Sequence, residues 1–204
     1  MIGEKVRWPT IALLTLCLLG GLLRKATAAE DAVVVPEGGL SGRFLQTISD
    51  EGGGALSTSE GEFALLKPHF FRWQINAPGR QLIISDGQTV WQYDQDLETV
   101  SRSPATHVAQ SPLALLLGDV ASLEQHYLID YGDGQITLVP TAAEPLFESL
   151  TVMFNDNQAT QLLIADSSGQ MIDITLSDTI EGALAPDDFR FIPPDEINVV
   201  DLES

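Results

Sequence analysis

Short runs of apolar and β-branched residues recur along the chain, separated by clusters of Gly, Asp, Asn and Ser. Within most runs apolar and polar side chains alternate, which puts the apolar ones on one face of a β-strand. Runs of this length, spaced about 8–12 residues apart, are typical of an all-β protein. The pattern predicts eleven strands, at residues 43–49, 61–66, 70–75, 81–85, 89–93, 98–102, 125–131, 135–139, 149–154, 158–165 and 170–176.

The connections between these runs favour tight turns. Asp86-Gly87 and Asp133-Gly134 are hairpin dipeptides, because Gly accepts the positive φ that such turns require. Connections this short predict an antiparallel meander, in which each strand pairs with the next one along the chain.

Two segments carry helical signals instead. Residues 111–118 begin with Ser111 and Pro112 and end with Gly118, which are start and stop signals for a short and very apolar helix. Residues 185–189 are predicted to form a second helical turn.

Large apolar residues occupy one face of most predicted strands, as Phe71, Trp73 and Ile75 do on one of them. A meander of eleven strands would form a wide, curled sheet, and two short helices supply little to cover its concave apolar face. A curled sheet under a small apolar helix can leave a cavity for an apolar ligand. The same pattern also fits the core of an ordinary β-sandwich or closed barrel, so it leaves these architectures open.

Residues 1–28 have the pattern of a secretory signal peptide. Lys5 and Arg7 precede an apolar run at residues 10–23, and residues 26–28 form an Ala-x-Ala cleavage site. The apolar run has 14 residues, whereas a helix that spans a membrane needs roughly 20. We therefore expect cleavage after the second of these alanines.

We expect residues 29–204 to form one exported domain, and the composition is consistent with a single folded domain. The 204 residues are 44% hydrophobic, which suffices for a core, and their formal net charge is −19. Cleavage would remove four basic residues and one acidic residue, and so bring the net charge to −22. Such a charge argues against nucleic-acid binding, which needs Lys and Arg to neutralise phosphates, and against docking on anionic membranes.

Catalytic patterns are weak. His69, His107 and His126 lie far apart without metal-ligand spacing, and no G-x-S-x-G motif occurs. The one cysteine, Cys17, lies inside the apolar run of the signal and follows a Leu rather than a small residue. Residues 94–98 carry alternating carboxylates but lack the Gly and the distal Glu of an EF-hand loop, so we expect an acidic hairpin tip. We expect no catalytic residue, no cofactor and no metal site.

Four segments of the chain carry a further pattern. They are EGEFALLKPHFFRW at 60–73, LIISDGQTVWQYD at 82–94, QSPLALLL at 110–117 and FRFIPP at 189–194. Taken together, they resemble the LolA family of outer-membrane lipoprotein carriers, in family order and at family spacing, within a match that covers roughly residues 40–200.

This resemblance implies a single curled antiparallel sheet that forms a half-open, unclosed β-barrel, with a short helical lid over a hydrophobic cavity. It also implies a function in the periplasm. The carrier would act as a monomer, without insertion into a membrane. It would take lipoproteins from an ABC-type release complex in the inner membrane, shield their acyl chains, and deliver them to an acceptor at the outer membrane.

By family position, Phe71, Trp73, Ile83 and Trp91 would line the sheet side of the cavity. The lid side would be lined by a second set, namely Leu113, Leu116 and Leu117. Plain core packing explains the same residues equally well, because a cavity wall and a core wall look alike in sequence.

Two departures from the family pattern affect the lid. The family usually has an Arg before the Pro of its Lys-Arg-Pro segment, where it helps to hold the lid shut, and here that residue is Lys67. Because Lys lacks the planar fork of Arg, we expect a looser lid. The family also has an amphipathic helix before the first strand, whereas residues 29–39 are not helix-like, so part of the roof is expected to be missing.

Two alternatives on the same fold stay open. One is a LolB-like acceptor, which would need a lipidated N-terminal Cys, and Cys17 lacks that context. The other is a periplasmic regulatory module that senses lipids or lipoproteins.

Overall fold

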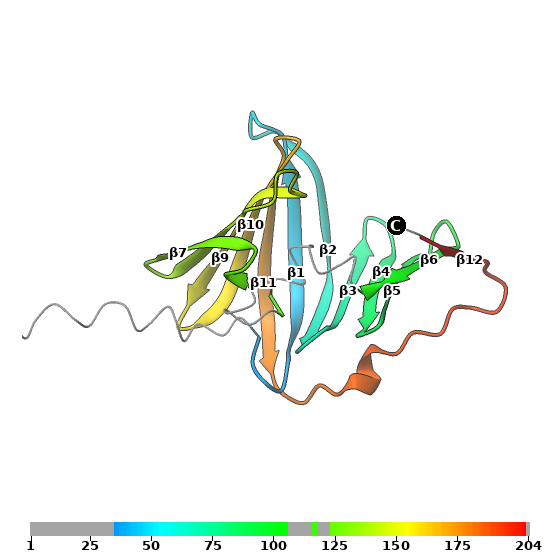
Figure 1. Ribbon diagram of the computed structural model, residues 1–204. Coiled ribbons are helices and arrows are strands. Elements are labelled where there is room, and N and C mark those ends of the chain that lie inside the picture. The colour runs from blue at the N-terminus through cyan, green and yellow to red at the C-terminus, as the bar shows by residue number, and fades with distance from the viewer. Residues whose placement is uncertain (1–34, 106–115, 118–122, 203–204) are drawn as a thin grey trace, which may run out of the picture.

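The computed structural model describes residues 35–105, 116–117 and 123–202 of the chain. One twelve-stranded sheet contains most of these residues (Figure 1). Its strands are β1 (Leu40–Ser49), β2 (Ala55–Leu66), β3 (Phe70–Ala77), β4 (Gln81–Asp86), β5 (Thr89–Asp94), β6 (Thr99–Pro104), β7 (Tyr127–Gly132), β8 (Gln135–Pro140), β9 (Phe147–Asn155), β10 (Gln158–Asp166), β11 (Met171–Glu181) and β12 (Val199–Asp201).

The prediction of an all-β protein is confirmed, since each of the eleven predicted runs overlaps one of β1 to β11. The largest difference in boundary is at β2, which begins at Ala55, well before the predicted start at Gly61. Four of the six added residues are polar and most of the six are exposed, so they show no apolar alternation. They are strand because they pair with β1, a contact that local sequence does not reveal.

The sheet is open, with β12 and β7 as its two edge strands and the order β12-β6-β5-β4-β3-β2-β1-β11-β10-β9-β8-β7. The predicted meander is therefore correct within β1–β6 and within β7–β11, and it is wrong between β6 and β7. The connection between these two strands, residues 105–126, joins opposite sides of the sheet instead of making a hairpin. Strand β1 pairs with both β2 and β11, which unites the two halves.

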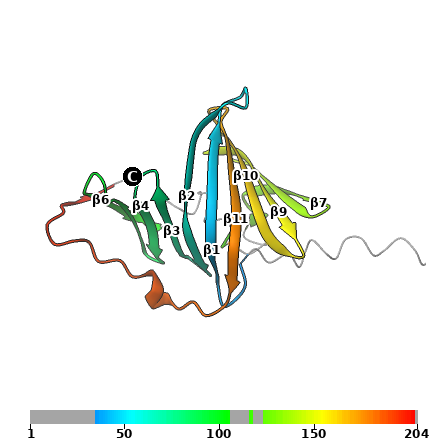
Figure 2. The ribbon, with the colours of Figure 1, turned by 180° about the vertical axis from the view of Figure 1, so that it is seen from behind.

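The sheet is curled, as the two opposite views in Figures 1 and 2 show. Its buried apolar side chains form one hydrophobic cluster. Buried side chains from β3 and from β9, on opposite sides of β1, belong to this cluster. Strands so far apart in an open sheet share a cluster only if the sheet bends towards it. We call the side of the sheet that faces this cluster the inner face, and the other side the outer face.

Residues 182–202, which we call the C-terminal strap, run past β3–β6 to the edge of the sheet (Figure 1), and their aromatic side chains pack on the outer face of these strands. The strap contains the short helix η2 (Pro186–Phe189), which confirms the predicted helical turn, and it ends in β12. Phe189 is fully buried, and its ring centroid lies 5.7 Å from that of Phe70 on β3. Strand β12 runs parallel to β6, where Arg102 donates a hydrogen bond to Asp201.

Several predictions fall on parts of the chain outside the described residues. These are the signal peptide at 1–28, most of the segment 29–39, and nearly all of the helix predicted at 111–118. Within the described ranges, no helix is both long and apolar enough to cross a membrane.

Candidate functional site

The inner face forms one apolar wall that extends over strands β1–β5 and β7–β11. It arises from strand alternation, because every second side chain of each strand points towards the cluster. The pairing register then places these side chains opposite one another on neighbouring strands, as with Phe63, Trp73 and Ile83. The buried members are Leu40, Phe44, Phe63, Leu65, Phe71, Trp73, Val90, Tyr127, Leu138, Phe147, Leu150, Val152, Ala159, Leu162, Ile164, Ile174 and Leu176.

Trp73 is at the centre of the aromatic part of this wall. Its ring stacks on Phe44 of β1, with centroids 3.8 Å apart and an interplanar angle of 20°, and it lies 6.0 Å from Phe63. Phe44 reaches Trp73 because Gly61, which pairs with Phe44, has no side chain. A Cβ at Gly61 would lie 2.8 Å from the Phe44 ring and would overlap the carbonyl oxygen of Gln74.

Three of the four residues predicted for the sheet side of the site lie on the inner face. Phe71 and Trp73 are 3% and 5% exposed, and Ile83 is half-buried against the same cluster. Two leucines of the predicted lid also belong to it, since Leu116 and Leu117 are both buried there. The structure therefore brings these five residues together, and their contact with acyl chains stays a prediction. Leu113 lies outside the described residues.

Trp91 lies on the outer face, so the expectation that it lines the inner wall is wrong. In the register Trp91 is opposite Ile84, whereas Ile83 is opposite Trp73. Directly opposed residues share a face and successive residues alternate, so Trp91 and Trp73 point to opposite sides. The strap explains this large apolar residue, because Phe191 packs 5.6 Å from the Trp91 ring.

Lys67, the predicted latch of the lid, lies half-buried in the turn between β2 and β3. Among the described residues it has no ion pair and no side-chain hydrogen bond. Most of the segment predicted to form the lid falls outside these residues, so the latching role stays a prediction.

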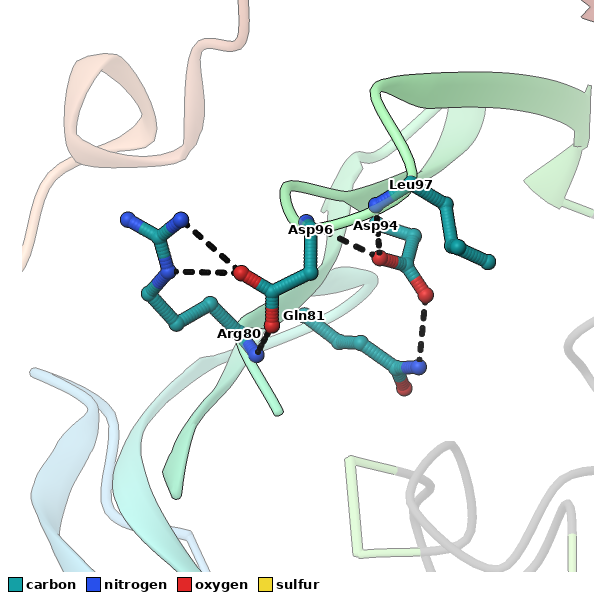
Figure 3. A network of polar contacts seen from close by, with 5 residues as sticks. All are labelled: Arg80, Gln81, Asp94, Asp96 and Leu97. Atoms are coloured by element: carbon teal, nitrogen blue, oxygen red, sulfur yellow. Dashed lines mark hydrogen bonds and ion pairs between the residues drawn. The ribbon is translucent and has the colours of Figure 1, made fainter. Parts of the chain in front are cut away.

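The acidic triplet at residues 94–98 has a structural role, as Figure 3 shows. The Asp96 carboxylate accepts hydrogen bonds from the backbone and the side chain of Arg80, both at 2.9 Å, and these bonds hold the pKa of Asp96 below its usual value. Asp94 accepts from the backbone N–H groups of Asp96 and Leu97 and from Gln81. The expected acidic hairpin tip is thereby observed, tied to the neighbouring β3–β4 turn.

Several inner-face residues were not predicted as part of the site, including Phe44, Phe63, Tyr127 and Phe147. Phe44 and Phe63 lie in predicted strands, and the alternation around them marks them as apolar positions. What the sequence does not reveal is that β1 is the central strand. That placement, together with the glycine at position 61, is what puts Phe44 against Trp73.

A protein-family model described as outer membrane lipoprotein carrier protein LolA matches residues 38–192. The chain belongs to the LolA family. The matched range runs from just before β1 into the strap, so it includes every residue of the inner face and every described residue of the hydrophobic cluster except Val35.

Curated relatives in the LolA family match most of the chain, and each bears the name outer-membrane lipoprotein carrier protein. That of Chromohalobacter salexigens is 35% identical over 187 residues, which cover 89% of this chain and 87% of the relative. That of Alkalilimnicola ehrlichii is 32% identical over 206 residues, which cover 97% and 96%.

Solved structures share the LolA fold at low sequence identity. A LolA superfamily protein from Nitrosomonas europaea aligns with a TM-score of 0.51 and 11% identity, covering 80% of this chain and 94% of that one. An uncharacterized conserved protein from Thermus thermophilus aligns with the same TM-score at 13% identity, covering 85% and 94%. These two likenesses concern the fold alone.

Proposed function

We propose that this protein is a periplasmic carrier of outer-membrane lipoproteins, and that the inner face holds their acyl chains. The observation that carries this proposal is the apolar wall on which Leu116 and Leu117 of the β6–β7 connection pack. Its chemistry suits acyl chains, because removing each CH₂ from water is favourable by about 0.8 kcal/mol. The names of the curated relatives support the same cargo.

The proposed roles follow from position. Phe71, Trp73 and Ile83 contact the acyl chains from the sheet, the leucines Leu113, Leu116 and Leu117 contact them from the lid, and Lys67 holds the lid. Hydrophobic contact is non-directional, so such a wall accepts acyl chains whatever protein they carry. The protein acts as a carrier rather than an enzyme. It takes cargo from an ABC-type release complex in the inner membrane and passes it to an acceptor at the outer membrane.

The test is a release assay. Purified residues 29–204 are mixed with spheroplasts or inner-membrane vesicles from the source cell, loaded with a labelled lipoprotein. We expect an ATP-dependent transfer of the lipoprotein into a soluble one-to-one complex.

A matched pair of variants connects this release to the inner face. Ile83→Glu introduces a charge on the wall and is expected to abolish release, because an unpaired carboxylate beside acyl chains is costly. Leu45→Glu introduces the same charge on β1, at a side chain that is 48% exposed. This variant is expected to release the lipoprotein from the membrane as the wild type does. Thermal melts show whether both variants fold. If the wild type binds acyl chains but releases no lipoprotein, the carrier proposal is wrong and a sensor or acceptor role takes its place.

A further inference from the structure

Two hydroxyl-bearing residues are buried on the inner face in the described chain, and they differ in their hydrogen bonding. Ser85 is 1% exposed, and its hydroxyl donates to the carbonyl oxygen of His69 at 2.8 Å. Tyr127 is 9% exposed, and no hydrogen bond joins its hydroxyl to another described residue. Of the two, Tyr127 alone brings a hydrogen-bond donor without a described partner to this largely apolar wall.

Tyr127 lies where the sheet meets the β6–β7 connection. It is the first residue of the edge strand β7, and it belongs to the same cluster as Leu116 and Leu117 of that connection. A polar group in this place is at the border of the apolar wall rather than at its centre.

The ring of Tyr127 is held firmly. It stacks on Phe147 of β9, with centroids 6.2 Å apart and an interplanar angle of 11°. Its backbone is fixed by pairing with Pro140 and by the preceding carbonyl of His126, which accepts bonds from both the backbone N–H and the hydroxyl of Thr141, each at 3.0 Å. The Tyr127 hydroxyl is protonated at neutral pH, as in any tyrosine, and burial raises its pKa further, so it can donate a hydrogen bond.

We propose that the Tyr127 hydroxyl donates a hydrogen bond to a carbonyl oxygen at the point where an acyl chain joins the lipoprotein. Acyl chains are attached to the lipoprotein terminus through ester and amide groups, whose carbonyl oxygens lose water when the chains are buried. Leaving such an acceptor unpaired is costly, so a fixed donor at the border of the wall sets how deep the chains enter. This inference rests on the proposed carrier function.

The test compares Tyr127→Phe with the wild type on three synthetic lipopeptides, with binding followed by Trp fluorescence. The first carries two ester-linked palmitoyl chains, the second carries the same chains as ethers, and the third is the ether peptide with an added N-palmitoyl amide. Loss of one neutral hydrogen bond predicts about a two- to tenfold weaker affinity for a carbonyl-linked probe. The plain ether probe is expected to bind both proteins equally. Tyr93→Phe, which removes a hydroxyl on the outer face beside Phe191, is the control and should match the wild type on all three.

The outcomes separate this inference from the function on which it rests. If the affinity falls only for the ester probe, the hydrogen bond is assigned to an ester carbonyl. If it falls only for the amide probe, the bond is assigned to the amide carbonyl. The inference is wrong if Tyr127→Phe binds every probe with the affinity of the wild type. It is also wrong if its affinity for all three probes falls by the same factor. If the wild type binds none of the probes, the proposed function itself fails.

Discussion

At the scale of single residues, the aromatic part of the wall depends on one glycine. Gly61 lets Phe44 approach Trp73 across two strands, to a centroid distance of 3.8 Å. Because its Cα lies against the backbone of β3, any side chain at this position collides with main-chain atoms, which cannot move aside as a flexible side chain can.

Gly61→Ala is therefore expected to lower the free energy of unfolding by about 1–3 kcal/mol, the usual cost of overpacking a core. Urea denaturation measures the change. Gly79→Ala is the matched control, because a Cβ there would meet nothing closer than Asp96 Oδ2 at 3.8 Å, and it should stay within about 0.5 kcal/mol of the wild type. Equal stabilities of the two variants would contradict this account of Gly61.

Lys67 gives a second prediction at this scale. If a Lys holds the lid less well than an Arg, then Lys67→Arg should close the lid further in the free protein. Residues 29–204 contain no cysteine, so Leu113→Cys allows a single environment-sensitive label on the predicted lid. We expect less quenching of that label by a soluble quencher in the Arg variant. A label at Ala55→Cys, at the exposed start of β2, should be unaffected. Equal quenching at position 113 in both proteins would refute the looser lid.

At the scale of elements, the C-terminal strap closes the outer face of β3–β6. Its hold depends on aromatic side chains, with Phe189 against Phe70, and Phe191 near both Trp91 and Tyr93. The guanidinium of Arg102 also lies 5.6 Å from the centroid of the Trp91 ring. The ion pair of Arg102 with Asp201 is exposed, so it fixes the position of β12 more than it stabilises the fold.

Phe189→Ala is expected to destabilise the protein by about 3–5 kcal/mol, because it empties a fully buried site between the strap and the sheet. Ile192→Ala shortens a neighbouring strap residue that is 78% exposed, and its effect should stay within about 0.5 kcal/mol. Urea titrations of both variants give the comparison. A mild effect of Phe189→Ala would mean that the strap contributes little to folding.

The strap also explains which parts of the fold the sequence could predict. Strands β1–β11 were predictable because their apolar alternation is local, whereas β12 has three residues and is defined by a distant partner, β6. The side on which Trp91 lies was not predictable for a related reason. Strand β4 is apolar on both faces, because Leu82, Ile83 and Ile84 follow one another. The strap covers one of these faces and the hydrophobic cluster lies against the other. The local sequence pattern therefore cannot tell which face is which.

At the scale of the whole molecule, the carboxylates far outnumber their partners. The six basic residues of the described chain are Arg43, Lys67, Arg72, Arg80, Arg102 and Arg190, and four of them form exposed ion pairs with carboxylates among the described residues. With a formal net charge of −19, most carboxylates therefore face water and one another. Such a surface is repelled by anionic membranes, which suits the proposed role as a carrier that does not stay bound to a membrane.

The same charge should make stability depend on salt. Self-repulsion of a highly charged chain destabilises its compact state, and raising NaCl from 0.01 M to 0.1 M shortens the screening length from about 30 Å to about 10 Å. We therefore expect the urea midpoint at pH 7 to rise over this range, although screening also weakens the few exposed ion pairs. Repeating the comparison near pH 4 provides the control, because the full chain has a sequence isoelectric point of 4.1 and the net negative charge is much smaller there than at pH 7. A midpoint that falls with salt at pH 7 would mean that the exposed ion pairs, such as Arg80 with Asp96, outweigh the excess of carboxylates.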